Sequence, residues 1–266
     1  MGRVIAVANQ KGGVGKTTTA VNLSAALALT NHRTLLIDLD AQGSASSGLG
    51  ASPRGRHTVY DLLTSELPAA AVLCPTELAE LDIIPADRDL AGAEVELVGL
   101  DSRESRLRSK IGEIRTGYDY VVIDCPPSLG MLTLNALSAA DSVLIPLQCE
   151  YYALEGLTNL LDTVEKIRAR FNEDLVLEGI LLTMFDARTS LSRQVADQVR
   201  SHFKAMVFRT VVPRNVRISE SPSHGLPVLL YDPASKGAQA YGQLAQELVE
   251  KYLITTSAIN IRGVCN

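Results

Sequence analysis

The stretch ANQKGGVGKTTTAVN, residues 8–22, decides the fold. It begins at the end of the apolar run VIAVAN (4–9) and continues into a segment with helical apolar periodicity, so a glycine-rich loop joins a strand to a helix. This context is typical of a phosphate-binding loop, whose pattern G-x-x-x-x-G-K-[ST] ends here in GKT (15–17). The first glycine of the pattern is replaced by Gln10, and an additional lysine, Lys11, follows it.

The chemistry of such a loop assigns expected roles to its residues. Glycines let backbone N–H groups turn toward phosphate oxygens and approach them closely, and the helix N-terminus adds the positive end of its dipole. Lys16 is expected to reach the β- and γ-phosphates, and the Thr17 hydroxyl is expected to ligate Mg²⁺. The predicted nucleotide-binding loop comprises Gly12, Gly13, Val14, Gly15, Lys16, Thr17 and Thr18.

Strand-like apolar segments alternate with helical segments along the whole chain. Most of them are continuous runs of Val, Ile and Leu, as in strands covered on both faces, and the alternation predicts a mostly parallel, doubly wound α/β sheet of the P-loop NTPase type. We expect one domain over residues 1–254 and a flexible C-terminal tail over 255–266, where helical periodicity is lost. The expected strands are 4–9, 34–39, 81–86, 120–125, 142–147 and 176–185, and the expected helices are 16–29, 103–115, 130–139, 154–171, 190–203 and 234–252.

The composition fits a globular protein of the cytoplasm. The chain has 266 residues, of which 46% are hydrophobic, enough for a large core. No segment approaches the ~18 uninterrupted apolar residues of a membrane-spanning helix, and the N-terminus enters a strand instead of a signal peptide. The four cysteines lack C-x-x-C spacing, so we expect buried reduced thiols: Cys74, Cys125, Cys149 and Cys265.

Magnesium needs acidic side chains near the loop, and two strand ends supply them. YVVIDC places Asp124 after an apolar run, where an aspartate of phosphate-loop proteins holds the metal directly or through water, and LLIDLD supplies Asp38 and Asp40. Because ligands of open parallel sheets bind beyond the carboxyl ends of the strands, these acids and the loop converge on one crevice. Taken singly, each aspartate is equally compatible with an ordinary turn.

Charge is distributed unevenly along the chain. The net charge of −5 disfavours nucleic acid, whose binding depends on Lys and Arg contacts to phosphates. Residues 186–236, however, contain eight basic and four acidic residues, a net +4 that leaves −9 on the remainder. A charged stretch is usually a solvated face, so the count leaves both a nucleic-acid surface and a solvated face open.

Several segments together resemble a known family. KGGVGKTT, DLDAQGSAS and IDCPPS resemble the deviant Walker ATPases that include ParA, MinD and the nitrogenase iron protein. Four more segments narrow the resemblance to the chromosomal ParA proteins called Soj, and it extends from residue 3 to about 252. These segments are AGAEVEL (91–97), QCEYYALEGL (148–157), LLTMFDART (181–189) and VVPRNVRISESPSHGLPVLLYDP (211–233).

The resemblance implies a mechanism. Such proteins are Mg²⁺-dependent ATPases of weak basal turnover that form a sandwich homodimer around ATP, and Lys11 would cross the interface to the partner's ATP phosphates. Asp40 would orient or activate the attacking water, with Asp38 nearer the magnesium shell. Pro213 and Asn215 match the segment that contacts adenine. A cation supplied by a partner stabilises charge in the transition state, as an arginine finger does. A solvated loop lysine and an ordinary Pro-Arg-Asn turn are the simpler alternatives.

The resemblance also implies partners. Arg188 and Arg217 match arginines that bind double-stranded DNA without sequence preference, and both lie in the basic stretch. A ParB-type centromere-binding protein would stimulate hydrolysis and reset the cycle. The expected location is therefore the cytoplasm, in association with the nucleoid and without membrane contact.

Three other functions use related sequences. A MinD-like membrane-associated positioning ATPase needs a basic amphipathic C-terminal helix, whereas residues 240–256 carry two Glu and one Lys. An iron-sulfur reductase needs two cysteines per subunit at a shared cluster, and neither Cys125 nor Cys149 matches that family's positions. A metabolic ATP-dependent ligase or kinase needs a second substrate motif, and none is evident.

Overall fold

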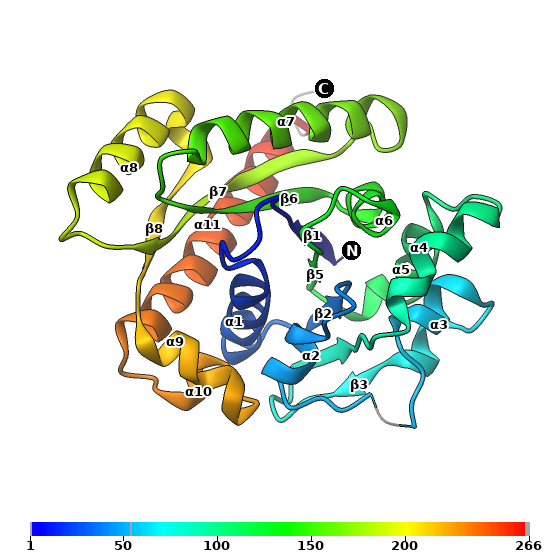
Figure 1. Ribbon diagram of the computed structural model, residues 1–266. Coiled ribbons are helices and arrows are strands. Elements are labelled where there is room, and N and C mark those ends of the chain that lie inside the picture. The colour runs from blue at the N-terminus through cyan, green and yellow to red at the C-terminus, as the bar shows by residue number, and fades with distance from the viewer. Residues whose placement is uncertain (1, 54, 264–266) are drawn as a thin grey trace.

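The computed structural model describes residues 2–53 and 55–263, which fold around one sheet (Figure 1). Its strands are β1 (Arg3–Val7), β2 (Thr34–Asp38), β3 (Cys74–Pro75), β4 (Leu81–Ile84), β5 (Tyr120–Asp124), β6 (Ser142–Gln148), β7 (Val176–Phe185) and β8 (Val207–Pro213). They form an eight-stranded sheet in the order β3-β4-β2-β5-β1-β6-β7-β8. Every neighbouring pair is parallel except β3 and β4. The predicted mostly parallel α/β sheet is confirmed.

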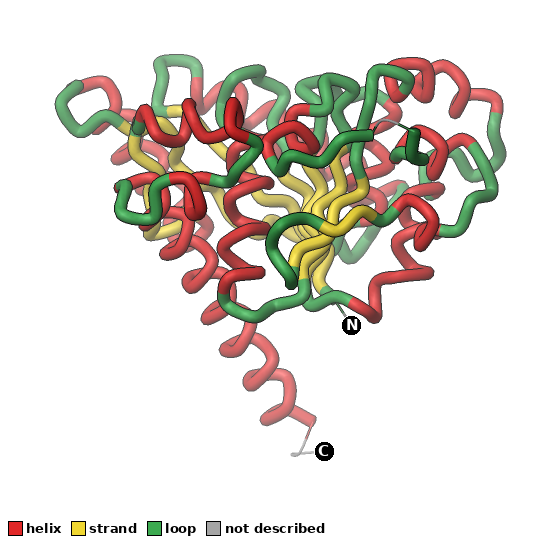
Figure 2. The backbone as a smooth tube through the Cα atoms, turned by 90° about the horizontal axis from the view of Figure 1, so that it is seen from below, coloured by secondary structure: helices red, strands yellow, loops and turns green. Residues whose placement is uncertain are grey.

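Helices cover both faces of this sheet. They are α1 (Lys16–Leu29), α2 (Ser44–Gly48), α3 (Val59–Thr64), α4 (Leu90–Glu96), α5 (Arg106–Ile114), α6 (Met131–Ala139), α7 (Ala153–Arg170), α8 (Ser190–Phe203), α9 (Val216–Glu220), α10 (Val228–Tyr231) and α11 (Lys236–Gly263). Figure 2 shows the end of α11 projecting from the rest of the fold on the side of the N-terminus.

The central strand shows how the two layers form. Successive side chains of a strand point to opposite faces, and in β1 both sets are apolar and buried. Val4 and Ala6 belong to the core beneath α3 to α8, whereas Ile5 and Val7 belong to the core beneath α1 and α11. Burial on both faces explains why the strands are continuous apolar runs.

The structure differs from the sequence-based expectation in its short elements. The six expected strands and six long helices are present, but β3 and β8 were not predicted. Strand β8 lies at the sheet edge and carries an exposed Arg209 in its middle, so its sequence lacks the continuous apolar run. Helices α2, α3, α4, α9 and α10 have four to seven residues, too few for a helical period to show.

The C-terminal segment keeps a helical backbone further than its periodicity suggested. Helix α11 continues to Gly263, so residues 255–263 extend the helix instead of forming an irregular tail. Residues 264–266 lie outside the described part of the chain. Flexibility of the segment from 255 onward stays a prediction.

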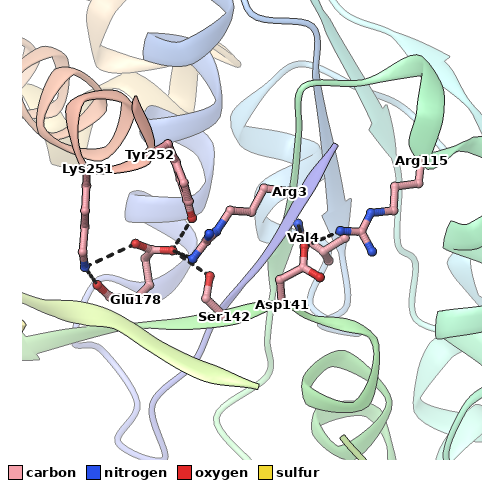
Figure 3. Close-up of polar contacts among 8 residues, drawn as sticks. All are labelled: Arg3, Val4, Arg115, Asp141, Ser142, Glu178, Lys251 and Tyr252. Atoms are coloured by element: carbon pink, nitrogen blue, oxygen red, sulfur yellow. Dashed lines mark hydrogen bonds and ion pairs between the residues drawn. The ribbon is translucent and has the colours of Figure 1, made fainter. Parts of the chain in front are cut away.

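Polar side chains join several elements at the amino ends of the strands (Figure 3). The carboxylate of Glu178, on β7, is 1% exposed and accepts hydrogen bonds from Arg3, Ser142 and Tyr252. Lys251 adds an ion pair at 3.5 Å. This buried carboxylate therefore ties β1, β6 and β7 to α11 at the amino edge of the sheet.

Candidate functional site

The glycine-rich loop leaves the carboxyl end of β1 and is anchored to two neighbouring strands. The Asn9 side-chain amide donates to the carbonyl of Pro146 at 2.7 Å, and its oxygen accepts from the Lys11 backbone N–H at 3.0 Å. The Thr183 hydroxyl donates to the Val14 carbonyl at 2.8 Å. Hydrogen bonds to β6 and β7 thus fix the loop before α1 begins.

Two glycines of the loop adopt a backbone conformation that other residues rarely take. Gly13 has φ 73° and Gly15 has φ 89°, both in the left-handed region. Gly15 is the N-cap residue of α1, and no side chain caps this helix end. The free N–H groups of the first turn and the helix dipole therefore favour an anion at this position.

Lys16 is the buried lysine of the loop. Only 7% of the residue is exposed, and its Nζ donates to the Lys11 carbonyl at 3.1 Å, so the side chain folds back over the loop. Burial lowers the pKa of Lys16, and the negative charge of Asp124 opposes that shift. The ammonium group therefore lies between the loop backbone and an acid, where it can bind phosphate oxygens.

Asp124 ends β5 and is completely buried. Neither of its carboxylate oxygens has a hydrogen-bond partner within the described part of the chain. Burial raises its pKa well above the ordinary value, the charge of Asp38 raises it further, and the hydroxyl of Thr17 and the charge of Lys16 favour the ionised form. A buried carboxylate without partners is costly unless a cation neutralises it.

These residues fit a magnesium ion. Mg²⁺ in nucleotide sites is usually held by one or two protein oxygens, with water and substrate phosphates completing its shell. Among residues 2–53 and 55–263 there is no group of three or more His, Cys, Asp or Glu side chains arranged to hold a metal. The Thr17 hydroxyl and the unpartnered carboxylate of Asp124 are the protein oxygens that match this requirement.

Asp38 lies beside Asp124 in the sheet register but is already hydrogen-bonded. One carboxylate oxygen accepts from the backbone N–H and the hydroxyl of Ser46, both at 2.8 Å, and the other accepts from the Asp40 N–H at 3.2 Å. Burial raises the pKa of Asp38 above its ordinary value. Asp38 therefore organises the loop that leads into α2, and its place near the magnesium shell stays a prediction.

Asp40 is the partly exposed acid of the same loop. Its carboxylate accepts from the Gln42 N–H at 3.0 Å, and its charge is close enough to raise the pKa of Asp124. The structure therefore brings Asp40 to the edge that holds Lys16 and Asp124. Its role in orienting or activating the attacking water stays a prediction.

Lys11 is placed differently from Lys16. Its side chain is 52% exposed and forms an ion pair with Glu150, which follows the carboxyl end of β6 and is 44% exposed. Sequence reasoning did not single out Glu150. Its position three residues after the predicted strand 142–147, on the edge shared with the loop, was the available signal.

The residues predicted to bind the base line a cavity next to the loop. Pro213 ends β8, Asn215 caps α9, and both line a cavity of about 610 Å³ together with Gly15 and Thr18 of the loop region. Met184 lines the same cavity and was not predicted. The cavity therefore connects the phosphate loop with the Pro-Arg-Asn segment.

Arg188 and Arg217 follow the carboxyl ends of β7 and β8. Arg188 is 87% exposed and forms two hydrogen bonds of 2.8–2.9 Å with Asp186, whose pKa it lowers to about 2. Arg217 pairs with Glu220 at 2.9 Å and Asp232 at 3.2 Å. Both guanidinium groups are thus locally neutralised.

Three other features lie outside this edge. A separate cavity of about 530 Å³ lies near Glu178 and has no loop residue in its lining. Three of the cysteines are buried free thiols, as predicted: Cys74, Cys125 and Cys149. Burial raises the pKa of Cys149 to about 11. Cys265 lies outside the described residues. None of the helices in the described part of the chain is long and apolar enough to cross a membrane.

A phosphate loop after the central strand of a parallel sheet, with buried aspartates at the same edge, defines a P-loop nucleotide-binding protein. Residues 2–177 match the family model described as AAA domain. The chain is 56% identical to chromosome partitioning protein ParA of Myxococcus xanthus over 94% of this chain and 89% of the relative, and 55% identical to sporulation initiation inhibitor protein Soj of Bacillus subtilis over 93% and 98%. The chain belongs to the ParA/Soj family of chromosome-partitioning ATPases.

Solved structures share the fold. A cobyrinic acid a,c-diamide synthase from Mycobacterium smegmatis with bound ATP analogue and magnesium has a TM-score of 0.83 at 39% identity, covering 95% of this chain and 96% of that one. The cell division ATPase MinD of Pyrococcus furiosus has a TM-score of 0.78 at 26% identity, covering 95% and 100%.

Proposed function

We propose that this chain is a slow Mg²⁺-dependent ATPase in which ATP binding joins two copies into a sandwich dimer. The observation that supports the proposal is the different placement of two lysines in one loop. Lys16 is buried against its own loop, whereas Lys11 lies on the exposed side. A single subunit can use Lys16 for its own nucleotide, and Lys11 could reach a neighbour once it leaves its exposed ion pair with Glu150.

The site residues would divide the work as follows. Lys16 and the N–H groups of the loop bind the phosphates, and the Pro-Arg-Asn cavity holds the base. Thr17 and Asp124 hold Mg²⁺, which neutralises charge on the phosphate oxygens when bound. Asp40 orients the attacking water. Lys11 of the neighbouring subunit stabilises the charge that develops during hydrolysis.

ATP hydrolysis would serve to switch the protein between two states. The ATP-bound dimer would bind DNA, and hydrolysis would release the protein from DNA. Arg188 and Arg217 would contact phosphates of double-stranded DNA without reading bases, and two copies in a dimer would bind more tightly than one through valency. A ParB-type protein would stimulate hydrolysis, and the DNA-bound form would associate with the nucleoid. The names of the ParA and Soj relatives reported above support this assignment.

The test is the ATPase rate with and without DNA, each with and without the ParB-type protein. Synergy between the two would support a partition ATPase, whereas a rate that neither changes would refute it. In the Asp40→Ala variant we expect ATP-dependent dimers that stay on DNA. A variant that still hydrolyses ATP at the wild-type rate would remove Asp40 from the mechanism.

A MinD-like membrane function is the second candidate. The MinD structure supports it through the shared fold, at 26% identity compared with 56% for ParA. Sedimentation with anionic liposomes and ATP separates the two, because clear pelleting without any DNA binding would favour the membrane function.

A further inference from the structure

Ser46 is a buried serine of α2 whose polar atoms join three segments of the chain. The residue is 1% exposed. Its hydroxyl donates to a carboxylate oxygen of Asp38 at 2.8 Å, and its backbone N–H donates to the same oxygen at 2.8 Å. The hydroxyl also accepts from the backbone N–H of Ala86, which follows β4, at 3.0 Å. One side chain therefore connects the end of β2, the start of α2 and the segment after β4.

The loop between Asp38 and Ser46 carries Asp40. Its backbone is closed by hydrogen bonds from the Asp40 N–H to the Asp38 carboxylate at 3.2 Å and from the Gly43 N–H to the Asp40 carbonyl at 2.9 Å. The Asp40 carboxylate is partly exposed and accepts from the Gln42 N–H of the same loop. The position of this carboxylate therefore depends on the loop backbone, which Ser46 fixes at its far end.

The segment after β4 also supports the middle of this loop. Gly43 has φ 61°, and a Cβ added there would lie 3.1 Å from the Ala86 carbonyl oxygen, so the two backbones are in close contact. Ala86 thus meets the loop at two points, and the Ser46 hydroxyl supplies the hydrogen-bonded one. Removing that hydroxyl would release the loop from both Asp38 and Ala86.

We infer that Ser46 is a positioning residue for ATP hydrolysis, which holds Asp38 and the loop so that Asp40 can orient the attacking water. The inference rests on the proposed function, which assigns that water to Asp40. Hydrolysis depends steeply on the placement of such a group, because a displacement of about 1 Å can slow a reaction about 100-fold. Phosphate binding depends instead on the glycine-rich loop, which is anchored separately to β6 and β7. Loss of the Ser46 hydroxyl should therefore slow hydrolysis more than it weakens nucleotide binding.

Single-turnover hydrolysis at saturating ATP and magnesium tests this inference, together with the affinity for a non-hydrolysable ATP analogue. We expect Ser46→Ala to hydrolyse ATP about 10- to 100-fold more slowly than the wild type and to bind the analogue within about 3-fold of it. Ser47→Ala is the matched control, because Ser47 lies on the same helix but is exposed. This control should match the wild type in both measurements.

The melting temperature shows whether Ser46→Ala is folded, since this variant leaves the N–H of Ala86 without its acceptor. If it does not fold, Ser46→Cys is the second variant, because it fills nearly the same space with a weaker hydrogen-bonding group. It should also slow hydrolysis without an equal loss of analogue affinity.

Two results would overturn the inference and leave the proposed function intact. One is a folded Ser46 variant that hydrolyses ATP at the wild-type rate, and the other is a variant whose hydrolysis rate and analogue affinity fall by the same factor. Both are interpreted beside Asp40→Ala, which should be inactive. If Asp40→Ala hydrolyses ATP at the wild-type rate, the assigned role of Asp40 is wrong and this inference fails with it.

Discussion

Lys11 and Glu150, 139 residues apart in sequence, form an ion pair within one subunit. The lysine that the proposed function assigns to a neighbour's ATP is therefore engaged by its own chain. In the proposed dimer Lys11 has to leave Glu150 for the phosphates. Glu150 thus competes with the proposed dimer for the same ammonium group.

Replacing Glu150 by Gln removes this competition. Because an exposed ion pair contributes about 0.2–1 kcal/mol and the dimer breaks one pair in each subunit, we expect ATP-dependent dimerisation to become at most about 30-fold tighter. The free energy of unfolding of one subunit should change by less than about 1 kcal/mol. Sedimentation with a non-hydrolysable ATP analogue measures the first effect and denaturant unfolding the second. A clearly weaker dimer would mean that Glu150 contributes to the assembled interface.

Replacing Gly12 or Gly15 by valine should affect stability and dimerisation differently. A Cβ at Gly12 meets no atom within 4 Å, so Gly12→Val should change stability by less than about 0.5 kcal/mol and keep ATP binding. It should nevertheless prevent the dimer, because the added side chain enters the space where the second copy approaches.

Gly15→Val places a branched residue at φ 89° and should lower the free energy of unfolding by about 1–3 kcal/mol. Thermal melts, nucleotide titrations and sedimentation separate the two outcomes, and a stable Gly12→Val dimer would contradict the first.

Asp124 should make the nucleotide-free protein sensitive to pH. Its raised pKa means that the folded chain keeps a proton that the unfolded chain releases, so stability falls as pH rises above the unfolded carboxyl value of about 4. One such group gives a slope of at most about 1.4 kcal/mol per pH unit. Asp124→Asn should flatten this slope. We also expect magnesium with ADP to raise the melting temperature of the wild type but not that of the variant. Calorimetry between pH 5 and 8 checks both, and an Asn variant that retains the full magnesium effect would exclude Asp124 as the ligand.

Asp186 restrains the arginine that is proposed to bind DNA. Since its pKa of about 2 keeps it ionised at neutral pH, Arg188 is neutralised by a neighbour two residues away. We expect Asp186→Asn to tighten DNA binding about 2- to 5-fold at low salt. Arg188→Ala should weaken it and, because the dimer loses one phosphate contact in each subunit, reduce the slope of log K against log salt by about 2. Fluorescence anisotropy on a duplex of random sequence, with ATP present, measures both, and equal affinity of all three proteins would remove Arg188 from the DNA surface.

The sequence by itself determined the phosphate loop, the long elements and the order in which they alternate. These features are local, because a strand buried on both faces needs a continuous apolar run and a phosphate loop needs GKT at a helix start. Lys16, Asp38 and Asp124 could be named from the same pattern, since Lys16 begins the helix after the loop and each aspartate ends a strand.

Only the tertiary structure decided which groups meet. In the structure, Lys11 pairs with Glu150, Ser46 donates a hydrogen bond to Asp38, and Arg188 pairs with Asp186. Within the described residues, neither carboxylate oxygen of Asp124 has a hydrogen-bond partner. These relationships depend on the order of parallel strands and on burial, which join residues far apart in the chain. No local pattern carries that information, because side-chain charge and exposure are set by neighbours that the fold supplies.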